Sequence, residues 1–118
     1  MRTTIARAST AVILAVLGAG AAIAAEPPYV GTWSLDPANC SQGQESQSAP
    51  MVIGKDRYDQ HESHCTFKSV EAKNSDWTVK SECTVEGSAT PYEFTLTVSG
   101  DTLTFTDSNG GRDLLRCK

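Results

Sequence analysis

The sequence is short of basic residues and has no apolar run long enough for a confident membrane span. Its 118 residues contain 10 Lys and Arg against 14 Asp and Glu, so the formal net charge is −4. Proteins that bind nucleic acid present a positively charged surface, which this composition does not supply. The same negative charge disfavours contact with anionic membrane surfaces. We therefore expect neither nucleic acid nor membrane among the partners of the folded protein.

Signatures of catalysis and of metal binding are also missing. The chain has no Gly-x-Ser-x-Gly turn around a nucleophilic serine and no helical His-Glu-x-x-His pair for zinc. Its four cysteines lack the short paired spacing of a structural zinc site. We therefore predict no catalytic residue, no metal and no cofactor, and we expect that the protein is not an enzyme.

The start of the chain has the pattern of a secretory signal peptide. Two arginines precede a run of apolar and small residues, and no acidic residue occurs before Glu26. Alanines at the end of the run provide a cleavage site after Ala24 or after Ala25. We assign residues 1–25 to the signal and residues 26–118 to a single domain. The mature protein is expected to be a soluble monomer, periplasmic or secreted.

The four cysteines all lie in the predicted mature domain. An even number of cysteines in a short exported chain indicates a disulfide framework, and each bridge contributes about 2–4 kcal/mol. Four cysteines allow three pairings. We favour Cys40 with Cys65 and Cys83 with Cys117, because the second bridge would attach the end of the chain to the predicted strand at 77–85.

Alternation of apolar and polar residues dominates the domain, and no stretch has the period of a helix. In residues 77–85 the odd positions are apolar or small and the even positions are Thr, Lys or Glu. Residues 92–98 repeat the pattern, and residues 102–106 continue it after a turn. The odd spacing of Phe67 and Val70, the apolar residues of another extended segment, indicates a bulge between them.

These segments number about eight and are separated by turns rich in Gly, Pro, Asn and Asp. We predict an all-β fold, a small antiparallel meander barrel or sandwich of about eight short strands, stapled by disulfides. A barrel of this size fills its interior with side chains, which leaves little room for a ligand.

The densest polar cluster contains both histidines of the protein. We predict that residues 57–63 form the second arm of a hairpin. On such a strand His61 faces away from Glu62 and His64, so the two imidazoles diverge and do not converge on one ion. We interpret the segment as a solvated strand. Adventitious metal binding and a partner-binding or pH-responsive surface are the alternatives.

A family resemblance rests on two short motifs. Gly31 to Trp33 form a Gly-x-Trp sequence on the first predicted strand, and residues 99–105 read Ser-Gly-Asp-Thr-Leu-Thr-Phe. Together they resemble the calycin group, and within it the small periplasmic inhibitors of bacterial metalloproteases. The resemblance implies a small β-barrel, a bridge across a loop as between Cys40 and Cys65, and a protein partner.

We therefore expect an exported, non-catalytic binding protein with an as yet unknown protein partner. Inhibition of a secreted or periplasmic hydrolase is the specific hypothesis, and a small-ligand or metal carrier in the periplasm is the alternative. The candidate binding residues are Trp33, His61, Glu62 and His64.

Overall fold

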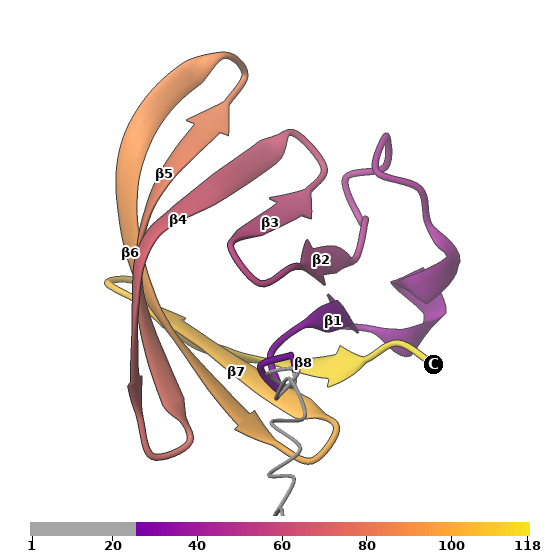
Figure 1. Ribbon diagram of the computed structural model, residues 1–118. Coiled ribbons are helices and arrows are strands. Elements are labelled where there is room, and N and C mark those ends of the chain that lie inside the picture. Colours follow the sequence, from indigo (N-terminus) through magenta and orange to yellow (C-terminus); the bar gives the residue numbers. More distant parts are fainter. Residues whose placement is uncertain (1–25) are drawn as a thin grey trace, which may run out of the picture.

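The computed structural model describes residues 26–118, and the predicted signal peptide lies outside them. Eight antiparallel strands follow one another around a closed barrel, with one short 3-10 helix after the first strand (Figure 1). The elements are β1 (Gly31–Ser34), η1 (Pro37–Ser41), β2 (Met51–Ile53), β3 (Arg57–Gln60), β4 (Ser63–Lys73), β5 (Asp76–Val85), β6 (Ser88–Ser99), β7 (Thr102–Asp107) and β8 (Gly110–Arg116). The predicted all-β fold is confirmed, in its barrel form. No helix in the described part is long and apolar enough to cross a membrane.

The two-residue period of the sequence determines which side chains of each strand are buried. On β5, Val79, Ser81 and Cys83 are buried, whereas the residues between them are exposed. The predicted bulge is also present, since the pairing of β4 with β5 shifts between Phe67 and Ser69. The shift brings Val70 opposite the buried Val79, on the same face as the buried Phe67, although Val70 itself is partly exposed.

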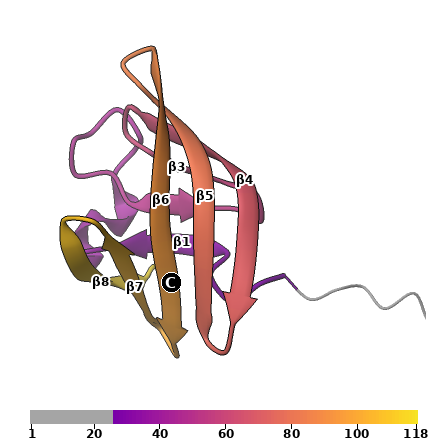
Figure 2. The same ribbon diagram turned by 90° about the vertical axis from the view of Figure 1, so that its left-hand side faces the viewer.

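The meander gives the barrel two different ends. In such a topology alternate connections lie at the same end, so the β3–β4, β5–β6 and β7–β8 turns share one end with the long β1–β2 loop. We call this the open end. The remaining turns and both ends of the described chain lie at the other, which we call the closed end. The β5–β6 hairpin projects beyond its neighbours at the open end (Figure 2).

Tyr29 fills the closed end. Only 2% of this residue is exposed, and its ring packs edge-on against Trp77 and Phe67, at centroid distances of 5.4 and 6.4 Å. Its hydroxyl donates to the carbonyl of Lys55 in the β2–β3 turn at 2.9 Å. Its own carbonyl accepts from the indole Nε1 of Trp33 at 2.9 Å. The segment before β1 therefore closes this end of the barrel.

Side chains fill the barrel interior, as predicted. Phe94 and Phe105 stack in its middle at a centroid distance of 4.7 Å, and Tyr58 packs edge-on against both. The buried cluster consists of Tyr29, Trp33, Met51, Ile53, Tyr58, Cys65, Phe67, Val79, Cys83, Phe94, Leu96, Leu103, Phe105 and Leu114.

The barrel closes where β1 meets β8. These strands pair only at Trp33 with Arg116 and at Ser34 with Leu115. The next amide, that of Cys117, donates to the carbonyl of Thr32 at 2.8 Å. We call this junction the seam.

The disulfide pairing differs from our prediction. Cys40 bonds to Cys117 and Cys65 bonds to Cys83, so the pairing favoured from the sequence is wrong. Cys65 and Cys83 face each other directly on β4 and β5, with Cα atoms 4.0 Å apart. Cys40 in η1 lies beside the end of β8 and secures the seam. Two disulfides indicate an oxidising, extracytoplasmic environment.

Candidate functional site

A hollow of about 350 Å³ lies at the open end, above the aromatic core. Its lining combines apolar atoms with hydroxyl, amide and guanidinium groups. It is lined by Tyr58, Gln60, Ser63, Cys65, Cys83, Val85, Thr90, Tyr92 and Arg112. We call it the open-end hollow. A second depression of about 410 Å³ adjoins it, sharing four lining residues with it and adding Leu35, Gln47, Met51, His61, Glu62 and Leu114.

Arg112 is common to both depressions and occupies an inward position. It precedes the buried Leu114 by two residues on β8 and pairs with the buried Phe105 on β7. Its guanidinium lies over the Phe105 ring, 5.0 Å from the centroid. Within the described residues, Arg112 makes no hydrogen bond and no ion pair. An inward arginine therefore faces the open-end hollow without a bonded counter-charge.

Tyr58 forms part of the floor beside it. The residue is 6% exposed, and its hydroxyl makes no hydrogen bond within the described residues. Every fully buried side-chain nitrogen or oxygen in residues 26–118 has a hydrogen-bond partner. Since the Tyr58 hydroxyl has none, it is not fully buried and retains contact with solvent. Burial raises the pKa of Tyr58 to about 12, against the opposing effect of the Arg112 charge. The phenol therefore stays protonated and able to donate at neutral pH.

Tyr92 differs from Tyr58 because its hydroxyl is engaged. It donates to the carboxylate of Asp107, which also accepts from the backbone amide of Asn109. Burial and the Asp107 hydrogen bond raise the pKa of Tyr92, and the same bond lowers the pKa of Asp107. Asp107 is therefore ionised at neutral pH, and the nearby charge of Arg112 also lowers its pKa.

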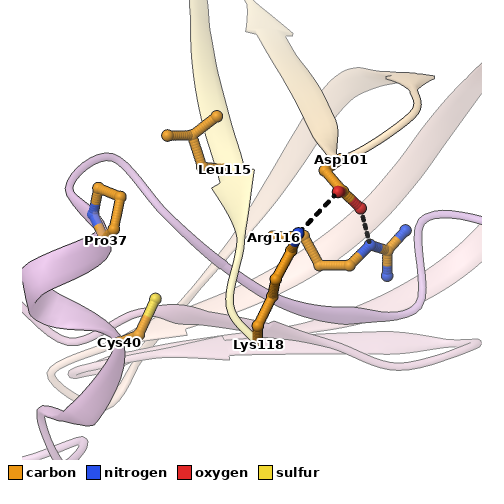
Figure 3. Close-up of a pocket in the computed structure, with 6 residues that line it drawn as sticks. All are labelled: Pro37, Cys40, Asp101, Leu115, Arg116 and Lys118. Atoms are coloured by element: carbon orange, nitrogen blue, oxygen red, sulfur yellow. Dashed lines mark ion pairs between the residues drawn. The ribbon is translucent and has the colours of Figure 1, made fainter.

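Another hollow, of about 440 Å³, lies beside the seam (Figure 3). There Asp101 lies between two cations, with its carboxylate oxygens 3.5 Å from Arg116 Nε and 3.3 Å from Lys118 Nζ. Arg116 also stacks on the Trp33 ring at 4.2 Å and donates to the carbonyl of Pro28 at 3.1 Å. The charges here are satisfied internally, so this second inward arginine has a structural role.

The histidine cluster is arranged differently from our prediction. His61 has a left-handed backbone, φ 54°, and forms the β3–β4 turn with Glu62, because Gln60 pairs directly with Ser63. Residues 57–63 are therefore not one strand, and the assignment of faces made from it is wrong. Arg57 to Gln60 do pair back on β2 as the second arm of a hairpin.

The three polar candidate residues nevertheless line one open depression at the rim of the open end. They are His61, Glu62 and His64. His61 Nδ1 lies 3.0 Å from the carbonyl of Gln44, and its Nε2 lies 3.8 Å from Glu62. His64 Nδ1 lies 2.6 Å from the carboxylate of Asp59 on the neighbouring strand. No group of three or more His, Cys, Asp or Glu side chains in residues 26–118 is placed to hold a metal ion.

Trp33, the remaining candidate, is fully buried. Its indole bonds to Tyr29 and its face carries Arg116, so it supports the seam and presents no surface to a partner. Neither Arg112 nor Tyr58 was among the candidates predicted from the sequence. The sequence does contain a signal for Arg112, because it lies two residues before the apolar Leu114 and would share its face in an extended segment.

Comparison with known proteins finds no matching family model, no similar curated protein and no similar solved structure.

Proposed function

We propose that this chain is an exported, non-catalytic binding protein that holds a partner protein at its open end. The observation that carries the proposal is the unpaired, inward-facing Arg112 in a hollow of a barrel that is otherwise filled and closed. The Arg112 side chain is exposed and makes no hydrogen bond within residues 26–118, so its donors are accessible to a partner, and its position over the hollow favours a role in recognition. Predicted export and the two disulfides support a periplasmic or secreted location.

The rim of the open end supports a protein partner. Leu35 and Val85 flank the depressions with 63% and 46% of their surface exposed, and the β5–β6 hairpin projects beside them (Figure 2). Exposed apolar side chains next to a recess provide the apolar contact area that a protein interface buries. The filled interior, by contrast, leaves no internal cavity for a large apolar ligand. The net charge of −4 favours a basic partner surface around the contact.

The specific hypothesis is inhibition of an exported hydrolase, and enzyme rates test it. The oxidised protein is incubated at micromolar concentration with a panel of bacterial metalloproteases and lysozymes. We expect one enzyme class to slow, and an Arg112→Glu variant to lose most of this effect. A matched Lys80→Glu variant, on the exposed outer face of β5, should keep it. Unchanged rates across the panel would count against inhibition.

A small-ligand carrier is the second candidate, favoured by the size of the open-end hollow. About 350 Å³ lies at the lower end of the range for small-molecule sites. Native mass spectrometry of protein taken directly from the cell envelope separates the two functions. A carrier arrives with added mass, whereas the protein-binding function predicts the mass of the bare chain.

A further inference from the structure

We infer that the open-end hollow recognises a carboxylate group, held by Arg112 and Tyr58. This inference rests on the proposed function, because it assumes that the binding surface is at the open end. It concerns the chemistry of the group that enters the hollow, whether a side chain of a protein partner or a free carboxylic acid.

The two inward arginines of β8 differ in the partners that they have. Arg116 has a carboxylate, an aromatic face and a backbone carbonyl as partners. Arg112, four residues earlier on the same face, stacks on the Phe105 ring and is near enough to Asp107 to lower the pKa of that carboxyl, but it forms no hydrogen bond or ion pair within the described residues. A guanidinium carries five N–H donors in a planar fork that fits a carboxylate with two parallel hydrogen bonds. The donors of Arg112 are free to make them.

The hydroxyl of Tyr58 provides a second donor in the hollow. It lines the same hollow, donates to nothing within the described residues, and lies close enough to Arg112 to sense its charge. Tyr92, across the hollow, is already committed to Asp107. A carboxylate between Arg112 and Tyr58 would therefore accept from a cation and from a neutral O–H.

The surroundings favour a single negative charge over a double one. Asp107 acts on the same hollow and Glu62 lines the adjoining depression, so a phosphate dianion would be repelled more strongly than a carboxylate. The floor is apolar, formed by Tyr58, the Cys65–Cys83 disulfide and the aromatic core below. It suits the hydrocarbon part of an acidic side chain or a short organic acid.

Amide chemical shifts measured during ligand titration test the inference. The probes are 3-phenylpropionate and a capped peptide with one glutamate, each paired with its uncharged amide, 3-phenylpropionamide or the glutamine peptide. We expect shifts at open-end residues with 3-phenylpropionate, at a Kd on the order of 1–10 mM for so small a ligand. The amide form should bind about tenfold to a hundredfold more weakly, because it loses the charge-assisted hydrogen bonds.

Variants identify the groups responsible. Arg112→Gln should weaken carboxylate binding to the level of the amide ligand, and Tyr58→Phe should weaken it while keeping the aromatic floor. Lys80→Gln removes one positive charge from the outer face of β5 and should leave the affinity unchanged. The dispersion of the spectra reports whether each variant remains folded.

The outcomes separate this inference from the proposed function. Binding of both the free acid and the glutamate peptide assigns the hollow to an acidic side chain, and binding of the acid alone assigns it to a free carboxylic acid. Equal binding of acid and amide, shifts outside the open end, or full affinity in Arg112→Gln would overturn the inference. The effect on hydrolase rates would still decide the proposed function, because that assay requires no carboxylate.

Discussion

Removal of the Cys40–Cys117 disulfide should destabilise the barrel at its seam. The perturbation is the double substitution of both cysteines by serine. The two residues are 77 positions apart, so the bridge closes a loop of about 78 residues. The chain-entropy relation gives about 4.5 kcal/mol for such a loop, against about 3.2 kcal/mol for the loop closed by Cys65 and Cys83.

The location of the loss follows from the pairing of the strands. β1 and β8 pair at only two positions, whereas β4 and β5 pair along almost their whole length. Without the bridge, β1, η1 and β8 should therefore open before the rest of the barrel. The total stability of a domain is about 5–15 kcal/mol, so the variant should be close to marginal at 37 °C.

Urea unfolding and hydrogen exchange measure the two parts of this prediction. We expect a lower free energy of unfolding, with faster amide exchange in β1 and β8 and little change in β4 and β5 at low temperature. A loss below about 1 kcal/mol, or exchange that rises evenly in all strands, would refute the assignment of this bridge to the seam.

Three further predictions concern single side chains. Burial raises the pKa of Tyr58 to about 12 and the pKa values of Tyr29 and Tyr92 are also raised, so ultraviolet titration should show less tyrosinate near pH 10 in the folded protein than in the denatured protein. Because the fold favours the protonated phenol, this contribution to stability is complete below pH 10 and is lost as the pH rises towards 12; a normal titration would contradict it. Arg116→Met should cost about 2–3 kcal/mol in urea unfolding, through the lost stacking and hydrogen bonds, whereas Arg112→Gln should cost less than about 1 kcal/mol; equal losses would contradict the contrast. Acrylamide should quench the fluorescence of Trp77 in part and that of Trp33 hardly at all, so complete quenching in the folded state would place Trp33 outside the core.

Local sequence patterns predicted the fold because they act over short distances. Alternation identified the strands, and the odd spacing of Phe67 and Val70 identified the bulge in β4. These features need only the two-residue period of a strand and the turn residues between strands. The all-β class and the number of strands follow from them, whereas the choice of a closed barrel over a sandwich is shown by the pairing of β1 with β8.

To predict the disulfide pairing from the sequence, two local predictions had to be combined. The turn at residues 74 and 75 and the one-residue bulge together set Cys65 opposite Cys83, which leaves Cys40 for Cys117. Each feature was visible in the sequence, but the pairing depends on the register that they fix jointly.

The candidate site was less accessible from the sequence. The two-residue period of β8 places both Arg112 and Arg116 on the inner face, yet only the three-dimensional structure shows that Arg116 forms an ion pair and Arg112 does not. Trp33 was selected as a binding residue, although its position on a strand facing the core makes it a packing residue. His61 was misplaced because its left-handed backbone ends a strand that alternation alone would continue.

Chemical labelling of arginine tests the central claim most directly, since it compares Arg112 and Arg116 in one molecule. The native, oxidised protein is treated with phenylglyoxal for increasing times, and modification at each residue is followed by mass spectrometry. Arg112 should react several times faster than Arg116 in the folded protein, and the two rates should become similar in denaturant. An Arg112 that reacts as slowly as Arg116 in the native state would contradict an unpaired guanidinium at the open end.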